Sequence, residues 1–156
     1  GKDKYQNLRI GMTGRLDTMQ AVVLDAKLDI FAEELALRQQ VADRYQDRIG
    51  KSVETPHLAG GASSSWAQYT IKLPGNVDRD AVCSRMQAAG VPTAIYYPVP
   101  KHCQPPYSHF PVAGGALQTT DRLSRCVMSL PMHPYLDADT QDVIVAALKD
   151  ALQSAG

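Results

Sequence analysis

The sequence predicts an α+β domain in which a long helix leads into a short sheet covered by helices. Apolar residues recur every three or four positions from Leu16 to Ile49, the period of an amphipathic helix. Polar and apolar residues alternate between Ser65 and Leu73, the period of a half-buried strand. Short strand-like and helix-like segments then follow each other to the carboxyl terminus, a pattern that favours helices packed on one face of a sheet.

The composition is that of an ordinary globular domain. The chain has 156 residues, 44% of them hydrophobic, and 16 basic residues balance 16 acidic ones. This apolar share excludes disorder, and a neutral chain is a poor match for nucleic acid. No apolar run approaches the roughly 20 residues of a membrane span. The three cysteines, Cys83, Cys103 and Cys126, form no Cys-x-x-Cys pair, so we expect reduced thiols and a cytoplasmic protein. From the charge balance and the short apolar runs we expect no nucleic-acid or membrane partner.

The first segment, residues 1–50, is predicted to be a connector loop followed by a long helical stretch. Asp17 or Thr18 can cap its start, because either side chain can accept a hydrogen bond from the first turn. The apolar period continues to Gly50, so two interpretations stay open: two abutting helices, or one helix bent near Asp29. A second apolar face is expected to be exposed or covered by self-association: Leu24, Leu28, Phe31 and Leu35.

Residues 51–156 are predicted to form the α+β domain itself, with a three-stranded sheet. In the first strand, Tyr69, Ile71 and Leu73 share one face. The next elements in chain order are a helix capped by Asp78 and running through Ala89, strand 91–97, helix 116–125, strand 126–130, and a helix after Asp137 with apolar Val143, Ala147, Leu148 and Leu152. Half of the ten prolines crowd the loop that follows the second strand.

Few patterns in the chain point to catalysis. The segment from Gly11 to Gly14 lacks the third glycine and the preceding strand of a nucleotide-binding loop. His102, Cys103 and His109 are neighbours without ligand spacing, so no metal site is predicted. No histidine has a paired carboxylate in the sequence, and a free cysteine is more often a small hydrophobe than a nucleophile. The chain therefore offers no predicted catalytic residue of its own.

Two segments combine a rigid backbone with side chains suited to binding. Arg15 follows a glycine pair at a helix start, so it either binds an anion or is a surface residue. Tyr96 and Tyr97 precede the proline-rich loop, and neighbouring strand residues alternate faces, so one ring packs while the other presents its hydroxyl. The loop itself is either a preorganised site or a stiff connector. A third segment, Ser129–Pro134, favours a simple strand-end turn.

Four segments resemble, in order, the carboxy-terminal part of one enzyme family: GRLDTMQAVVLDAKLDIFAEELALRQQVADRY, SSSWAQYTIKL, RDAVCSRMQAAGVPTAIYYPVPKHCQPPY and SLPMHPYL. The family is that of the DegT/DnrJ/EryC1/StrS aminotransferases, which are pyridoxal-phosphate-dependent sugar aminotransferases of fold type I. The resemblance implies the small carboxy-terminal domain of that fold, preceded by the interdomain helix. It also implies a homodimer, with pyridoxal 5'-phosphate bound mainly by an amino-terminal large domain that these residues do not include.

The resemblance further implies a reaction. An amino acid donor, by family glutamate, gives its amino group to a nucleotide-linked keto sugar. The Leu16–Ala21 and Ile95–Pro98 runs look closest to enzymes that aminate a UDP-linked 3-keto hexuronic acid for O-antigen synthesis. In the family a lysine of the large domain forms the Schiff base, and we expect this chain alone to be inactive because none of its seven lysines matches that motif: Lys2, Lys4, Lys27, Lys51, Lys72, Lys101 and Lys149.

Site residues also follow from the resemblance. The family's Gly-x-Asn-x-Arg segment matches Gly11–Arg15, which implies that Thr13 and Arg15 bind the cofactor and that Arg15 also binds substrate. Thr13 replaces the family's asparagine and has a shorter reach. The family's aromatic-Tyr-Pro and Pro-Leu-His segments line the nucleotide-sugar pocket, here with Lys101 in place of leucine. They imply four substrate-binding residues: Tyr96, Tyr97, Pro98 and His102.

Two alternatives share these features. A related sugar dehydratase has the same fold but replaces the imine lysine by histidine, a difference that lies outside the residues in hand. A non-catalytic regulatory or dimerisation paralogue would retain only the small-domain fold.

Overall fold

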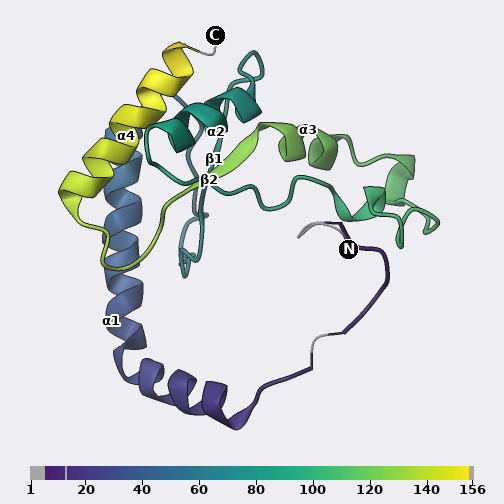
Figure 1. The fold of residues 1–156 in the computed structure, drawn as a ribbon, viewed down its shortest axis with the longest axis horizontal. Helices are drawn as coiled ribbons and strands as arrows, with labels where there is room; N and C mark the ends of the chain where they lie inside the picture. The colour runs from purple at the N-terminus through teal and green to yellow at the C-terminus, as the bar shows by residue number, and fades with distance from the viewer. Residues whose placement is uncertain (1–5, 13, 155–156) are drawn as a thin grey trace.

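The computed structural model describes residues 6–12 and 14–154 (Figure 1). Thr13 therefore lies outside the described residues. The elements follow in the order α1 (Thr18–Ile49), β1 (Tyr69–Lys72), α2 (Arg79–Ala88), η1 (Lys101–Cys103), η2 (Ala113–Gly115), α3 (Gln118–Cys126), β2 (Val127–Leu130) and α4 (Ala138–Gln153). Of the two candidate caps of α1, the structure has Asp17, and the predicted caps Asp78 and Asp137 are confirmed; each of these side chains accepts a hydrogen bond from the first turn of its helix.

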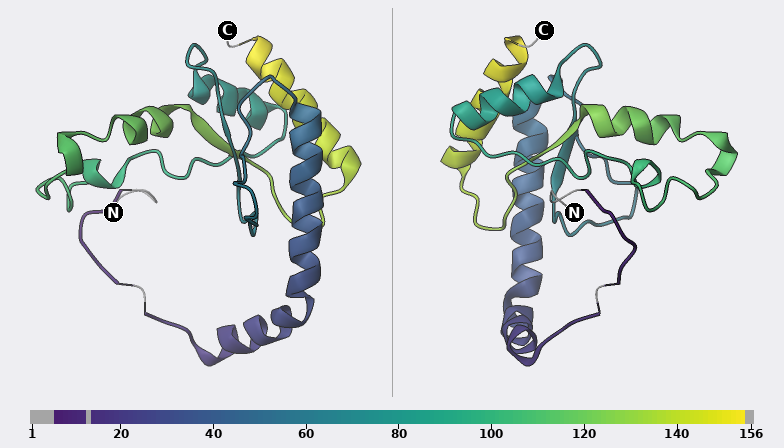
Figure 2. Two further views of the ribbon diagram at one scale, coloured as in Figure 1. Left: turned by 180° about the vertical axis from the view of Figure 1, so that it is seen from behind. Right: turned by 45° about the vertical axis from the view of Figure 1, so that its right-hand side comes forward.

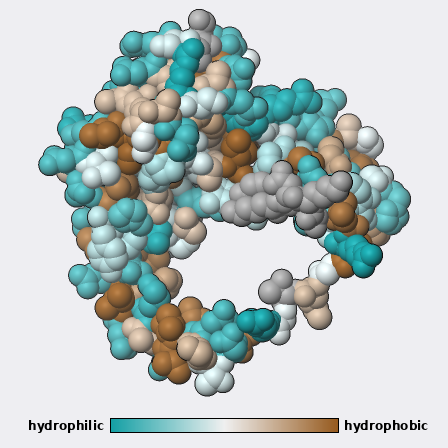
Figure 3. All heavy atoms as spheres, in the orientation of Figure 1, coloured by the Kyte–Doolittle hydropathy of each residue, from teal (hydrophilic) through white to brown (hydrophobic). Residues whose placement is uncertain are grey.

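Helix α1 is one continuous helix that bends. Its first part runs across the bottom of the view and the rest turns upward to the domain (Figures 1 and 2), which confirms the single bent helix of the two interpretations. The predicted apolar face of the first part is exposed at Leu24, Leu28 and Phe31, whereas Leu35 is half-buried. Figure 3 shows hydrophobic side chains gathered over this part of the helix.

The sheet has two strands, not the predicted three. β1 pairs antiparallel with β2, and the Thr70 and Ser129 hydroxyls meet across the pair at 2.8 Å. The segment predicted as the second strand joins the sheet only through Ala94, whose backbone N–H and C=O bond Ser129 at 3.1 and 2.7 Å. On one side of Ala94, Pro92 and the opposing Pro131 have no amide hydrogen, so the pairing cannot extend there. On the other side, the Val127 N–H bonds the Leu123 carbonyl of α3.

The hydrophobic core lies where the second half of α1 meets the sheet, α2 and α4. Each element contributes residues at its own period: Val41, Ala42, Tyr45 and Ile49 of α1; Tyr69 and Ile71 of β1; Val82 and Met86 of α2; Met128 and Leu130 of β2; Ile144, Val145, Leu148 and Ala151 of α4. The predicted inward face of β1 is thereby confirmed. Val143 departs from the expected apolar face of α4 and is 61% exposed, because it lies on the side of the helix turned away from α1 and α2.

Polar contacts fix α4 against α1. The Gln141 side chain, itself buried, donates to the Val41 carbonyl at 3.0 Å. One carboxylate oxygen of Asp142 accepts from Arg44 at 2.8 Å and from Arg48 at 3.1 Å. Because a buried amide and a shared carboxylate both join the same two helices, their relative position is specified by polar groups as well as by apolar packing.

Two buried tyrosines differ in how their hydroxyls are satisfied. Tyr45 donates to the Pro131 carbonyl at 2.9 Å, whereas no partner for the buried Tyr69 hydroxyl occurs in the described structure. Their rings lie 4.9 Å apart between centroids. Burial raises the pKa of Tyr69 to about 12 and raises the pKa of Tyr45 as well.

We predict opposite outcomes for removing these two hydroxyls. Tyr45→Phe is expected to lower the free energy of unfolding by about 1 kcal/mol, because it leaves the Pro131 carbonyl without its donor. Tyr69→Phe is expected to leave that free energy unchanged or to raise it, because the lost hydroxyl is already unpaired in the described residues. Urea unfolding of the two variants measures the difference, and equal destabilisation by both would contradict the assignment.

Candidate functional site

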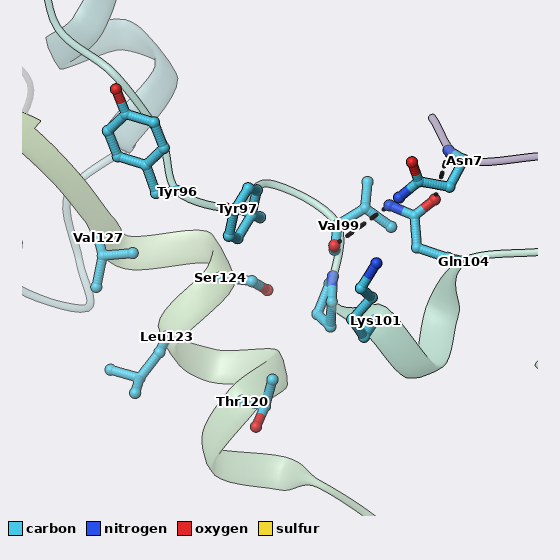
Figure 4. Close-up of a pocket in the computed structure, with 11 residues that line it drawn as sticks. Asn7, Tyr96, Tyr97, Val99, Lys101, Gln104, Thr120, Leu123, Ser124 and Val127 are labelled. Carbon is cyan, nitrogen blue, oxygen red and sulfur yellow. Dashed lines mark hydrogen bonds between the residues drawn. The ribbon is translucent and has the colours of Figure 1, made fainter. Parts of the chain in front are cut away.

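A cavity of about 750 Å³ lies between the proline-rich loop and α3 (Figure 4). The loop supplies one wall and α3, with the start of β2, supplies the other, while the amino-terminal segment approaches from outside (Figures 1 and 4). Its lining residues are Asn7 of that segment, Tyr96, Tyr97, Val99, Pro100, Lys101 and Gln104 of the loop, Thr120, Leu123 and Ser124 of α3, and Val127 of β2.

The loop wall is held by a buried amide. Gln104 is only 4% exposed although it lies in an irregular segment. Its side-chain oxygen accepts from the backbone N–H of Asn7 at 3.0 Å, and its nitrogen donates to the Val99 carbonyl at 3.5 Å. Gln104 therefore joins the amino-terminal segment to the loop at the edge of the cavity, where Pro98 and Pro100 limit the backbone further.

The opposite wall is one face of α3. Thr120 and Ser124 are four residues apart and so lie on the same side of the helix, with Leu123 beside them. The Ser124 hydroxyl donates to the Asp121 carbonyl one turn earlier at 2.9 Å. The Arg79 side chain, which is largely buried, donates to the Ser124 carbonyl and ties α3 to α2. This wall is therefore anchored to the core domain.

The cavity combines aromatic rings, hydroxyls and one positive charge. The Tyr96 and Tyr97 rings meet edge-on with centroids 6.1 Å apart, and the peptide bond between them is cis. Figure 4 shows the Tyr97 ring of the loop next to Ser124 of α3, whereas the Lys101 side chain extends towards Gln104 and Asn7. Among the described lining residues Lys101 carries the one formal charge, and its ammonium lies 4.7 Å from the Tyr107 ring centroid. Such a cavity suits an anionic ligand with a flat or polyhydroxylated body.

The structure gathers only part of the predicted site. Tyr96 and Tyr97 line the cavity. Pro98 lies between them and Val99 but is not a lining residue, and His102 turns to Asp121, with 3.1 Å between Nε2 and Oδ1. The Arg15 side chain is 81% exposed and pairs with Asp17 at 3.3 Å, outside the cavity. The substrate-binding roles of Tyr96 and Tyr97 stay predictions, as do the roles of Thr13, Arg15, Pro98 and His102.

Several cavity residues were not predicted from the sequence. Asn7 and Gln104 meet although 97 positions separate them, a contact that periodicity does not report. Thr120 and Ser124 carry a usable signal, since two hydroxyls four residues apart form a polar stripe on one helix face. Lys101 was visible as a departure from the family's leucine, and the structure places this residue in the cavity wall.

The described residues do not by themselves form a site for pyridoxal 5'-phosphate. Such a site needs a lysine for the Schiff base and donors around the phosphate. Among the described lining residues Lys101 is the one lysine, and its ammonium lies over the Tyr107 ring. Arg15, the described residue predicted to approach the cofactor, is elsewhere on the surface. No step of cofactor chemistry is therefore assigned to these side chains.

Two solved structures are similar to this chain along nearly its whole length. A DegT DnrJ EryC1 StrS aminotransferase from Brucella abortus matches with a TM-score of 0.81 at 41% sequence identity, covering 96% of this chain and 39% of its own. DesV of S. venezuelae, in a structure with a ketimine intermediate, matches with a TM-score of 0.80 at 27% identity, covering 98% of this chain and 41% of its own. The fold class expected from the sequence, the small α+β domain of these enzymes, is thereby confirmed.

Residues 1–149 match the DegT/DnrJ/EryC1/StrS aminotransferase family, and the chain belongs to that family. The UDP-2-acetamido-2-deoxy-3-oxo-D-glucuronate aminotransferase of Pseudomonas aeruginosa is 42% identical to it over 150 residues, which are 95% of this chain and 40% of that enzyme. The chain thus spans about 40% of the length of this curated relative. Among the described helices none has the length and apolar character needed to cross a membrane.

Proposed function

We propose that the chain is the carboxy-terminal part of a pyridoxal-phosphate-dependent aminotransferase that converts a nucleotide-linked keto sugar into an amino sugar. Residues 1–50 serve as connector and interdomain helix, and residues 51–156 as the small domain. The amino donor is an amino acid, and glutamate is the donor we propose. The product is used in the cytoplasm for the synthesis of a surface polysaccharide (O-antigen). The observation that carries the proposal is the cavity with two tyrosines and one ammonium, in a chain of this family.

The chemistry of the cavity supports a nucleotide sugar as the ligand. A volume of about 750 Å³ is that of a site for a ligand of this size. The Tyr97 ring offers a face for a base or a sugar, and the hydroxyls of Thr120 and Ser124 offer partners for sugar hydroxyls. The Lys101 ammonium suits a diphosphate or a uronic acid carboxylate, consistent with the acidic sugar in the name of the P. aeruginosa relative.

In this proposal the described residues bind and orient the sugar. The cofactor, when bound, supplies the electron sink for amino transfer. Tyr96, Tyr97 and Lys101 hold the nucleotide sugar from the loop side, and the anchored α3 wall fixes its depth. Because the cavity is preorganised by prolines and by Gln104, little order has to be gained when the sugar binds.

The first part of α1 supports a larger assembly. Its apolar side chains are exposed over a contiguous stretch, and patches of this kind usually mark an interface. In the proposal this stretch packs on the large domain of the full-length enzyme, which acts as a homodimer. Arg15, just before α1, then reaches a neighbouring subunit.

Covalent trapping tests the class of enzyme. The full-length gene product that contains these residues is incubated with pyridoxal 5'-phosphate, reduced with borohydride and mapped by mass spectrometry. The proposal expects the label on one lysine outside residues 1–156, in a Ser-x-x-x-x-Lys context. A histidine at that position without label would favour the dehydratase, and a protein that binds no cofactor would favour the non-catalytic paralogue.

A substitution at Arg15 tests the predicted contact with an acidic substrate. In the full-length enzyme, Arg15→Ala is expected to lower kcat/KM for a UDP-linked uronic acid by about tenfold or more, because a bidentate guanidinium–carboxylate contact is lost. Arg9→Ala, an exposed arginine of the same connector, serves as the matched control and should keep the wild-type value. An unchanged kcat/KM for Arg15→Ala removes this residue from the substrate site.

A further inference from the structure

Three side chains with metal-ligating atoms converge next to the cavity. His102 and Cys103 follow each other in η1, and Asp121 lies in the first turn of α3. Each residue offers one ligand atom, and the three atoms lie within 4.8 Å of one another: an imidazole nitrogen, the thiol sulfur and a carboxylate oxygen. The sequence predicted no metal site because His102, Cys103 and His109 lack ligand spacing, and the third group comes instead from a separate helix.

We propose that His102, Cys103 and Asp121 form a zinc site, with water in the fourth position. Imidazole, thiolate and carboxylate are all established zinc ligands, and three protein ligands plus water make an open tetrahedral site. A thiolate beside an imidazole favours zinc over magnesium or calcium, which take oxygen ligands. The proposal does not depend on the aminotransferase function.

The distances fit such an ion. Zinc–ligand bonds of about 2.0–2.3 Å place neighbouring ligand atoms roughly 3.3–3.7 Å apart in a tetrahedron. The Nε2 to Oδ1 distance of 3.1 Å between His102 and Asp121 is close to this spacing. The Cys103 sulfur already lies within 4.8 Å of the other two ligand atoms, and its exposed side chain has freedom about χ1 to approach them more closely.

The charges balance as well. Without metal, His102 Nε2 and the Asp121 carboxylate contact each other directly. Zinc takes the place of that contact by binding a neutral imidazole and a carboxylate, and the Cys103 thiol gives up its proton to solvent as its sulfur becomes a ligand. One thiolate and one carboxylate then neutralise the two charges of the ion, and the imidazole remains neutral. At side-chain exposures of 21% for His102 and 38% for Asp121, the pair is partly shielded from water.

The position of the site gives it a consequence for the cavity. The proposed ligands are sequence neighbours of cavity residues. Lys101 and Gln104 flank His102 and Cys103 in the loop, and Thr120 precedes Asp121 in α3. A bound ion therefore joins the loop wall to the α3 wall. Zinc is expected to raise the midpoint temperature of thermal unfolding of the chain. Zinc bound at this site also limits how far the loop wall and the α3 wall can separate.

Cobalt substitution tests the site in the tag-free 156-residue chain. Co²⁺ is expected to give tetrahedral visible bands and a near-ultraviolet thiolate-to-cobalt charge-transfer band that Zn²⁺ abolishes by displacement. Cys103→Ser should remove the charge-transfer band, and Asp121→Asn, which keeps a partner for His102, should weaken Zn²⁺ binding by about tenfold or more. Circular dichroism confirms that each variant is folded.

Cys126→Ser is the matched control, a half-buried cysteine of α3 outside the cluster, and it should keep the band. A wild-type chain without the band overturns the proposal. So does a Cys103→Ser variant that retains it, because the thiolate ligand would then be another cysteine.

Discussion

Leu148→Ala is expected to lower the free energy of unfolding by about 2–5 kcal/mol, a large share of the stability of a domain of this size. Leu148 is 0% exposed and lies on the face of α4 that packs into the core shared with α1, α2 and the sheet. Alanine removes most of its apolar burial and leaves a space that a close-packed core fills only in part. Urea or thermal unfolding, followed by circular dichroism, measures the effect.

Val143→Ala is the control for this prediction, because it makes a similar reduction in size on the exposed side of the same helix. Because Val143 is 61% exposed, the Val143→Ala substitution is expected to change the free energy of unfolding by less than about 0.5 kcal/mol. A Leu148→Ala variant no less stable than Val143→Ala would show that α4 does not pack on the core as described.

Ser124→Trp is expected to block the cavity and to raise KM for the nucleotide sugar by about tenfold or more in the full-length enzyme, since a bulky ring replaces space needed by the ligand. Ser124 lines the cavity from α3, and its hydroxyl bonds only within its own helix in the described contacts. The indole therefore has room without displacing a core residue. The half-reaction with glutamate alone should keep its rate, which separates a lost sugar site from a misfolded enzyme.

Ser84→Trp gives the matching control, since Ser84 is an exposed residue of α2 whose hydroxyl also bonds one turn back, to the Asp80 carbonyl. It should leave KM for the sugar at the wild-type value. If Ser124→Trp behaves like Ser84→Trp, the nucleotide sugar does not enter the cavity between the loop and α3.

Local sequence patterns predicted most of the elements. The cap residues Asp78 and Asp137 and the alternation of Tyr69, Ile71 and Leu73 report interactions within a few residues, so they can be recognised without a fold. The predicted third strand was wrong. Residues 91–97 satisfy the strand pattern, but Pro92 lacks the amide hydrogen that would extend the pairing on one side of Ala94, and the Val127 amide opposite the other side bonds α3 instead.

The candidate site was predicted less completely than the fold. Tyr96 and Tyr97 could be found because aromatic residues before a proline-rich loop stand out, and the structure places both at the cavity. The contact of Asn7 with Gln104 and the approach of Asp121 to His102 join distant parts of the chain. Such contacts follow from how the loop packs on α3, which no local period encodes.

The bend of α1 shows the same limit. The sequence indicated a long amphipathic stretch and a break or bend, and the structure has one continuous bent helix. Its buried residues, Val41, Ala42, Tyr45 and Ile49, all lie in the second half. The apolar pattern of the first half is thus explained only by a partner surface, which the proposed large domain supplies.

Amino transfer by the full-length gene product tests the proposed function most directly. The enzyme is loaded with pyridoxal 5'-phosphate and given glutamate with a UDP-linked 2-acetamido-3-keto-glucuronate, and 2-oxoglutarate and the amino sugar are quantified together. The account predicts that 2-oxoglutarate and the amino sugar form in equal amounts. When the keto sugar is omitted, no amino sugar forms and 2-oxoglutarate does not exceed one equivalent of enzyme. A cofactor-loaded protein that aminates no UDP-linked or dTDP-linked keto sugar would contradict it.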